Sequence, residues 1–397
     1  MVRFGRGPFT YVYVFGEAAN AEILGDGHNR FTWREALRPL EAVDGPTALP
    51  LTDGEDHDRR RRLVQPAFAT RRIDAAVPLI VAEVDKVING LRVGDTVDLY
   101  ALYRAAVRRI VVRVLFGSAL AENSDRLGEV LEPAMRFVDR PLQLQFKGAP
   151  GWRRARRARH EADAIVDTEL ARRRSHDDAG TDVLGMLLVT GLSDAELRDQ
   201  VVSLIAAGYD TTSAAVAWAV LELLRHPVEW EALKAQVLAR LGLDGRAPDA
   251  DDLRETPYGR AVVNETLRLW PPAPLSGRRA AEAFTVDGHQ IPAGSIVVFS
   301  PFVTGRSAAL WGDDADAFRP GRWLEQPEPP TFSFIPFGGT HRRCLGFALA
   351  LTEIQVAVTR LVQRTRLTLL PQATIRGTGL SALHPERGVA VRIDSVA

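Results

Sequence analysis

The most apolar stretch of the chain runs from residue 201 to residue 221 and is apolar nearly all round. Upstream of it, Ser193 and Glu196 form a capping-box pattern that predicts a helix N-terminus. His226 and Pro227 predict the end of that helix near residue 225. At about 1.5 Å per residue the helix is roughly 48 Å long, enough to cross a whole molecule. Because it has no polar face, we expect it to be buried.

A membrane span is the alternative interpretation of this helix. Asp210, Thr211, Thr212 and Ser213 at its middle argue against a span, because a carboxylate exposed to lipid is costly. Residues 1–16 also lack the continuous apolar core of a signal sequence or anchor. We therefore expect no membrane anchor and a cytoplasmic location.

Helical periodicity recurs along much of the remaining chain. It predicts helices over residues 71–91, 99–116, 123–138, 152–174 and 347–362. Thr256 is expected to cap a further helix that begins at Pro257 and ends before Pro271. Short strands are predicted at residues 11–15, over residues 278–300 with a turn at Asp287 and Gly288, and within residues 363–397. The expected fold is mainly α with small β-sheets (α+β), a helix-rich lobe and a smaller β-rich lobe, in one domain over residues 1–397.

Composition narrows the class of protein. The 397 residues are 46% apolar and 25% charged with a formal net charge of zero, which argues against bulk affinity for nucleic acid. The basic run at residues 152–159 leaves nucleic-acid binding open, although a solvated helix face beside Glu161 and Asp163 explains it as well. One cysteine excludes an internal disulfide and suits a reducing compartment.

That cysteine, Cys344, directly precedes the predicted helix at residues 347–362. Unpaired N–H groups and the positive end of the helix dipole lie at such a position. With Arg342 and Arg343 beside it, we expect the thiolate to be favoured over the thiol. The alternative is that Cys344 is a small buried apolar residue.

The middle of the long helix carries a second candidate site. Gly208 lowers the stability of a helix, and burying Asp210 without a partner would cost more free energy still. The presence of both residues in a buried helix therefore suggests a functional reason. A Thr211 hydroxyl that bonds back to a carbonyl opens a helix locally. Together Gly208, Asp210 and Thr211 predict a local opening in the helix, called the notch below, that holds a small polar ligand and water. A capped helix kink is the alternative.

Two pairs of charged residues lie at helical spacing. His57 and Arg61 share one helix face and can grip carboxylates, unless they belong to a solvated basic turn. Glu265 and Arg268 are one turn apart and can form an ion pair.

In combination these segments resemble the cytochromes P-450, the haem-thiolate monooxygenases, in their bacterial soluble type. The family's haem-ligand loop is matched by Phe337, Arg342, Cys344 and Gly346, whereas Thr340 stands where the family usually has Gly. Residues 207–212 match the family's oxygen-activation sequence. Residues 265–268 and 320–322 match its Glu-x-x-Arg and Pro-x-Arg elements.

The resemblance implies a role for each matched residue. Cys344 would be the axial ligand of haem b, and the long helix would cross the haem. Thr211 would hydrogen-bond dioxygen while Asp210 helps to relay protons. The other implied cofactor contacts are Phe337, Arg342, Gly346 and Ala207, with His57, Arg61 and Arg278 (or its neighbour Arg279) at the propionates. Glu265, Arg268 and Arg322 would form a structural network.

The resemblance also implies the reaction and the partners. One oxygen atom of dioxygen would enter a small lipophilic substrate, by hydroxylation or epoxidation. No nucleotide-binding glycine loop or cysteine-rich cluster motif is present, so a separate ferredoxin or flavodoxin with an NAD(P)H reductase is expected, docked on the Cys344 side of a monomer. About fifty residues that usually precede the first strand, including a helix, are expected to be missing. The alternatives are a haem-thiolate peroxygenase or isomerase and a haem-binding sensor or carrier.

Overall fold

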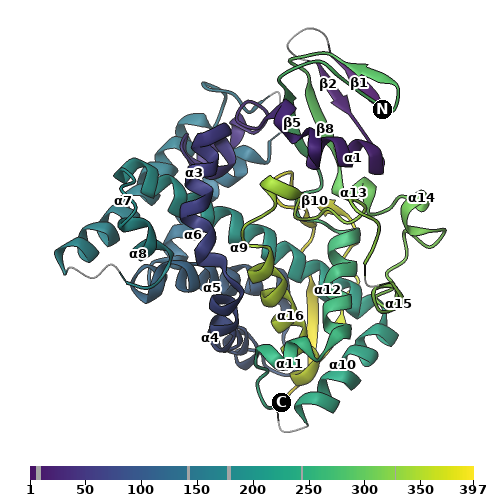
Figure 1. Cartoon of the computed structure of the whole chain (residues 1–397). Helices are drawn as coiled ribbons and strands as arrows, with labels where there is room; N and C mark the ends of the chain where they lie inside the picture. The colour runs from purple at the N-terminus through teal and green to yellow at the C-terminus, as the bar shows by residue number, and fades with distance from the viewer. Residues whose placement is uncertain (6–9, 141–143, 177–179, 243–244, 327) are drawn as a thin grey trace.

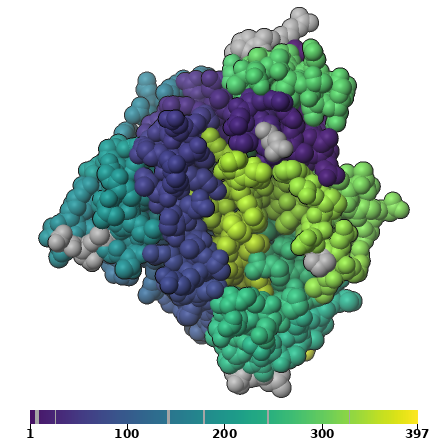
Figure 2. Space-filling model, viewed as in Figure 1, coloured from purple at the N-terminus to yellow at the C-terminus, as the bar shows by residue number. Residues whose placement is uncertain are grey.

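The computed structural model describes all residues except 6–9, 141–143, 177–179, 243–244 and 327. One long helix, α9 (Asp194–Arg225), runs through the middle of the molecule, and other helices surround it (Figure 1). The strands near the N-terminus gather at one end, beside α1 (Glu17–Leu24). In Figure 2 the blue segment after residue 50 lies next to the yellow-green C-terminal segment, so parts distant in sequence share one surface. The mainly helical α+β architecture predicted from the sequence is confirmed.

The other helices include those predicted at residues 71–91, 99–116, 123–138, 152–174, 257–270 and 347–362, together with shorter helices that were not predicted. They are α2 (Glu41–Asp44), α3 (Gly54–Val64), α4 (Thr70–Asn89), α5 (Leu99–Ala121), α6 (Ser124–Val138), α7 (Trp152–Ser175), α8 (Val183–Leu188), α10 (Pro227–Leu241), α11 (Ala250–Arg254), α12 (Pro257–Leu269), α13 (Pro301–Thr304), α14 (Ala308–Trp311), α15 (Arg322–Glu325) and α16 (Phe347–Arg364).

The long helix begins and ends where its sequence signals predict. The Ser193 hydroxyl accepts from the Glu196 N–H while the Glu196 carboxylate accepts from the Ser193 N–H, which completes the capping box. Among the described residues α9 is the one helix long and apolar enough to cross a membrane, and 78% of its most apolar window is buried inside the protein. Its apolar character therefore reflects a place in the core.

A close approach explains the glycine in the middle of α9. A β-carbon at Gly208 would come within 2.9 Å of a methyl group of Val111 on α5. The absence of a side chain thus lets α5 pack directly against the long helix. Gly208 also faces the interior cavity described below, so one residue serves both the packing and the notch.

The strands form four small sheets. The largest has the order β1 (Val2–Phe4), β2 (Tyr11–Tyr13), β8 (Ile296–Phe299), β5 (Ser276–Ala280) and β3 (Phe31–Thr32), with β2 and β8 parallel and the other pairs antiparallel. A second sheet has the order β4 (Thr96–Asp98), β12 (Ala390–Val396) and β9 (Thr365–Leu369). Two-stranded sheets are formed by β6 (Phe284–Val286) with β7 (His289–Ile291), and by β10 (Gly377–Thr378) with β11 (His384–Pro385).

Local hydrogen bonds and backbone angles explain why the predicted turn between β6 and β7 is present and why the predicted side-chain cap at Thr256 is absent. Asp287 (φ 48°) and Gly288 (φ 74°) join β6 to β7 as the predicted tight turn, since both adopt positive φ. The prediction that Thr256 caps α12 is wrong. Its hydroxyl instead donates to the carbonyls of Asp252 and Leu253, and closes α11.

Candidate active site

An interior cavity of about 360 Å³ lies between α9 and the segment that leads into α16. Most of its lining is apolar, including Phe68, Leu204 and Leu349. The polar groups that face it come from α3, α9, β5 and the Cys344 segment, which are far apart in sequence. A largely apolar cavity with a few convergent polar groups is the usual form of a ligand site.

The segment before α16 presents Cys344 to this cavity. The Cys344 N–H donates to the Phe337 carbonyl at 2.9 Å, and Gly338 turns the chain with a φ of 71°. This hydrogen bond and the turn at Gly338 fold the segment back on itself just before α16 begins. Cys344, Phe337, Arg342 and Gly346 all line the cavity. The accessible surface of Cys344 therefore faces the interior of the protein.

The acidity of Cys344 differs from the expectation based on the helix terminus. Burial raises the pKa of the Cys344 thiol, and this outweighs the Gly346 N–H, Arg61 and Arg343, which lower it. The prediction that neighbouring protein groups favour the thiolate of Cys344 is therefore wrong when no cation is bound to the sulfur. The thiol is the favoured form unless a cation binds the sulfur, because a thiol that coordinates a metal is deprotonated.

Arg278 on β5 is a buried cation without an acidic partner. Its side chain is 2% exposed, and it donates to the Ser276 hydroxyl at 2.9 Å and the Gly277 carbonyl at 2.7 Å. Its guanidinium lies 3.2 Å from the ring centroid of Trp33. No ion pair joins Arg278 to an acid among the described residues. Burial lowers its pKa well below the usual value, and Arg342 lowers it further.

Arg342, Arg61 and His57 also face the cavity with Arg278. Arg342 donates to the Thr52 carbonyl at 2.8 Å and pairs with Asp53 at 3.0 Å. Arg61 donates to the Arg343 carbonyl at 2.9 Å. His57 is buried, and burial together with Arg342 lowers its pKa to about 4, so its imidazole is neutral near pH 7.

This donor set fits a ligand that carries carboxylates. Arg278 is oriented into the cavity with its charge uncompensated, and Arg61 adds a second cation at the same site. Carboxylates accept bidentate hydrogen bonds from guanidinium groups. Arg279, the neighbour that the sequence left open, pairs with Glu35 at 2.6 Å and does not line the cavity.

The polar notch predicted in α9 is divided between two sides of the helix. Ala207, Gly208, Thr211 and Thr212 line the cavity, and the Thr211 hydroxyl donates to the Ala207 carbonyl at 2.6 Å. Asp210 does not line it. The sulfur of Cys344 and the hydroxyl groups of α9 thus face one apolar cavity.

Comparison with known proteins identifies the family. The model of the family described as Cytochrome P450 matches residues 1–387. The chain belongs to the cytochrome P450 family. The chain is 40% identical to a protein of Mycobacterium tuberculosis named cytochrome P450 139, over 99% of this chain and 94% of that protein. It is 32% identical to the cyclooctat-9-en-7-ol 5-monooxygenase of Streptomyces melanosporofaciens, over 83% of this chain and 74% of that enzyme.

A solved structure shows the same fold. The structure described as retinoic acid bound cyanobacterial CYP120A1 matches with a TM-score of 0.86 at 25% sequence identity, over 98% of this chain and 90% of that one. The P450 fold and the family implied by the sequence are thereby confirmed. The protein is a cytochrome P450 monooxygenase, a class of haem-thiolate enzymes.

The P450 loop departs from its family pattern at Thr340, which adopts a positive φ of 40°. The Thr340 hydroxyl donates to the Leu24 carbonyl at the end of α1. Gly339 packs so closely there that a β-carbon would lie 2.9 Å from that of Leu24. The loop is therefore held against α1 by a side chain that a glycine lacks, at a backbone cost of about 1 kcal/mol.

The P450 structure brings Glu265, Arg268 and Arg322 together. Arg268 donates twice to Glu265 at 2.8 Å, and Arg322 donates to the same carboxylate at 2.9 Å. The indole of Trp323 and the Arg319 N–H also donate to Glu265, both at 2.9 Å. Glu265 is completely buried, so its charge is compensated entirely by these donors.

Some residues of the P450 site and its surroundings were missed by sequence reasoning. Trp33 and Glu353 line the cavity, and neither carries a local signal that marks it. Ala273 and Ser276 also line the cavity. Between His57 and Arg61, Arg60 is buried and pairs with Asp56 and with Glu196, the latter at 2.7 Å.

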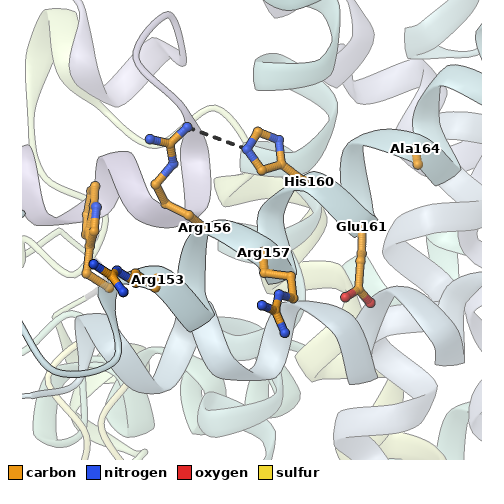
Figure 3. Close-up of a pocket in the computed structure, with 7 residues that line it drawn as sticks. Arg153, Arg156, Arg157, His160, Glu161 and Ala164 are labelled. Carbon is orange, nitrogen blue, oxygen red and sulfur yellow. Dashed lines mark hydrogen bonds between the residues drawn. The ribbon is translucent and has the colours of Figure 1, made fainter. Parts of the chain in front are cut away.

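The basic run of α7 lies at the surface. Figure 3 shows Arg153, Arg156, Arg157 and His160 projecting from this helix, with Arg156 and His160 3.5 Å apart. Arg159 is the exception, because it is buried and pairs with Asp163 and Asp199. A solvated face accounts for the exposed arginines, and the expected lack of nucleic-acid binding stays a prediction.

Proposed function

We propose that this P450 holds haem b through Cys344 and inserts one oxygen atom of dioxygen into a lipophilic substrate. The supporting observation is that the only cysteine, an uncompensated buried arginine and the α9 hydroxyl groups face one apolar cavity. Bound haem supplies the redox chemistry that activates dioxygen. The chain is proposed to act as one domain and as a monomer.

Protein groups would bind and orient the cofactor. Arg278 and Arg61 would bind its carboxylates, with His57 and Arg342 donating beside them. Phe337, Gly346 and Ala207 would contact its faces. The carboxylate would stabilise Arg278 most strongly, because a buried cation without a counter-ion is high in free energy and a carboxylate supplies that counter-ion.

Thr211 and Asp210 would bind and transfer protons on the side of the cavity opposite Cys344. Thr211 exposes its hydroxyl oxygen to the cavity while donating to Ala207, so it can accept a hydrogen bond there. Asp210, buried behind it, is held by Arg104 at 2.9 Å. Burial raises the pKa of Asp210 and Arg104 lowers it, with burial the larger effect. Because burial favours its protonated form, we propose that Asp210 takes up and releases protons during turnover.

The substrate class follows from the lining and the relatives. The apolar lining suits a lipophilic molecule. One relative is named for an oxidation of cyclooctat-9-en-7-ol, and the P450 of similar structure is described with retinoic acid bound. We propose hydroxylation or epoxidation of a terpenoid, steroid, fatty acid or polyketide, with electrons from a ferredoxin or flavodoxin and its reductase.

Ligand replacement tests this function. Cys344→Ser should abolish the red-shifted Soret band that the ferrous carbonyl complex of thiolate-ligated haem shows, while haem still binds. Retention of that band in the variant would exclude Cys344 as the ligand. Turnover with hydrogen peroxide alone, and none with reductase and ferredoxin, would instead support the peroxygenase alternative.

A further inference from the structure

The face of α9 that lines the cavity has polar residues near both ends and apolar residues between them. Its lining residues, at intervals of about one helical turn, are Gln200, Ser203, Leu204, Ala207, Gly208, Thr211, Thr212 and Ala215. The proposed function uses the Thr211 end and gives the Gln200 end no role. At about 1.5 Å per residue, Ser203 and Thr211 lie roughly 12 Å apart along the helix axis.

Gln200 has a buried amide with one unused donor. The residue is 1% exposed, its side-chain carbonyl accepts from the Leu49 N–H at 3.2 Å, and its amide donates to the Thr47 carbonyl at 2.7 Å. A glutamine amide has two N–H donors, and no described residue accepts from the second. A buried donor without an acceptor is destabilising. Because two hydrogen bonds already fix the amide, its second N–H is held at the cavity wall for an acceptor on a ligand.

Ser203, one turn further along α9, places a hydroxyl at the same part of the wall. The residue is 5% exposed and hydrogen-bonds to the carboxyl group of Asp44 at the end of α2. Ser203 lines the cavity, whereas Asp44 does not. A hydroxyl has one donor and two acceptor sites, so the bond with Asp44 leaves Ser203 able to form another with a ligand.

The charged groups at this end of the cavity leave no counter-ion for a charged ligand. No charged side chain of α9 lines the cavity. Behind the wall, Arg159 of α7 pairs with Asp163 at 2.8 Å and with Asp199 at 2.7 Å. Asp199 also accepts from the N–H and the hydroxyl of Thr47. A carboxylate or an ammonium group would therefore be buried here without a free partner, which is costly, whereas a neutral hydroxyl needs none.

We infer that Gln200 and Ser203 select a lipophilic alcohol as the substrate, by binding its hydroxyl group at the end remote from the carbon that is oxidised. The inference rests on the proposed function, which places the oxidation beside Thr211. The substrate oxygen accepts from the second Gln200 N–H and forms its other hydrogen bond with Ser203. The oxidised carbon then lies on the order of 10 Å from that oxygen, since about 12 Å of helix separates Ser203 from Thr211. A hydrocarbon of the same shape would leave both protein groups without a partner.

Binding of matched ligand pairs to the holoenzyme tests this selection. The probes are androstane with androstan-3-ol, bornane with borneol, and dodecane with dodecan-1-ol, each titrated by the change in the Soret band. In the pair that binds most tightly, the alcohol should bind roughly 10-fold or more tightly than the hydrocarbon. The carboxylic acid and the amine of the same skeleton should bind no better than the hydrocarbon.

Substitutions in the wall show whether these side chains recognise the ligand or only support the fold. Ser203→Ala should lower the affinity for the alcohol by roughly 3- to 10-fold and leave the affinity for the hydrocarbon unchanged. Ser203→Thr retains a hydroxyl and should keep the preference for the alcohol. Gln200→Met removes the second N–H and should also weaken the alcohol more than the hydrocarbon. Leu204→Ala, at the adjacent apolar position, is the control and should weaken both ligands by the same factor.

The outcomes separate this inference from the proposed function. If the wild type lacks a thiolate-haem spectrum, the proposed function fails first. If that spectrum is present but the hydrocarbon binds as tightly as the alcohol in every pair, or Ser203→Ala weakens both ligands alike, the inference alone is wrong. Should Ser203→Ala fail to bind haem, Gln200→Met is titrated in its place, and an equal loss of affinity for both ligands would overturn the inference in the same way.

Discussion

Asp210 and Thr211 are adjacent in sequence but face different environments, because Asp210 accepts a hydrogen bond from Arg104 at 2.9 Å while Thr211 lines the cavity. The carboxyl group of Asp210 and the hydroxyl group of Thr211 thus lie on different sides of the same turn of α9. Arg104 is held in turn by Glu132 of α6, at 3.1 Å. The arrangement keeps a carboxyl near the cavity without placing its charge among apolar side chains, where it would be costly.

Removal of the Thr211 hydroxyl should uncouple the enzyme without unfolding it. Thr211→Ala deletes a donor and acceptor at the cavity wall while the Ala207 carbonyl remains in the helix ladder. Haem content and substrate affinity should be retained, whereas product per NADPH falls and peroxide accumulates. Thr211→Ser restores the hydroxyl and should recover coupling. Equal coupling in all three proteins would remove Thr211 from the proton path.

Replacement of Arg278 should affect the haem-free and haem-loaded proteins in opposite directions. Arg278→Met removes a buried cation that has no acidic partner among the described residues, so the haem-free protein should be more stable, by about 1–4 kcal/mol. The loaded protein should lose haem faster, because a carboxylate partner is gone. Urea unfolding and haem transfer to apomyoglobin measure the two effects. Arg279→Met, which loses only a pair with Glu35, should change neither strongly.

The Glu265 network predicts a large loss of stability from a small chemical change. Glu265→Gln leaves Arg268 and Arg322 buried without a carboxylate, and breaking such a buried pair costs about 3–5 kcal/mol. Denaturant unfolding should show this loss. Glu325→Gln, which affects an exposed pair with Arg319, is the control and should cost less than about 1 kcal/mol. Similar losses in both variants would show that the Glu265 network is not a main source of stability.

Strong local patterns made much of this architecture predictable from sequence. The capping box at Ser193 and the uninterrupted apolar face of α9 depend on neighbouring residues only, and both were predicted correctly. The Thr256 cap was wrong because Pro257 begins α12 while the Thr256 hydroxyl is already bound to α11. The pKa of Cys344 was misjudged because burial is a tertiary effect that helix polarity does not report.

The missed residues share the same cause. Glu353 lies in a regular amphipathic helix, and its burial against the cavity is set by α9 and other segments rather than by its own neighbours in sequence. Trp33 reaches Arg278 from a segment without regular periodicity. Sequence motifs therefore locate ligands that lie within one segment, whereas residues that complete a cavity from several segments need the structure.

Substitutions at Thr340 compare the free-energy cost of its positive φ with the stabilisation from its hydrogen bond to Leu24. Thr340→Ala keeps a β-carbon at positive φ and loses the bond to Leu24, so it should be less stable than the wild type by about 1 kcal/mol. Thr340→Gly loses the same bond but relieves the backbone, and should be more stable than the alanine variant by about 1 kcal/mol. Thermal unfolding of the three proteins measures the difference. An alanine variant as stable as the glycine variant would show that the positive φ carries no cost.

A buried acid at the end of α2, Asp44, should give the fold a distinct pH dependence. Asp44 is 6% exposed, and burial raises its pKa from 3.8 to about 7, against the lowering effect of Arg159. Asp199 raises this pKa further and Ser203 lowers it. Between pH 4 and 7 the native state thus keeps a proton that the unfolded chain has lost. Stability must therefore fall as pH rises through that window.

Asp44→Asn isolates this contribution, because other titrating groups affect both proteins alike. From pH 5 to pH 7 the wild type should lose about 2 kcal/mol of stability relative to the variant, since each pH unit below the native pKa corresponds to about 1.36 kcal/mol and Asp44 is half ionised at a pH equal to its pKa of about 7. Urea unfolding at pH 5, 6, 7 and 8 measures the difference. The exposed Asp313→Asn serves as the control and should follow the wild type at every pH. If the wild type and Asp44→Asn run parallel as well, Asp44 is ionised in the native state, and the pairing with Arg159 must outweigh its burial.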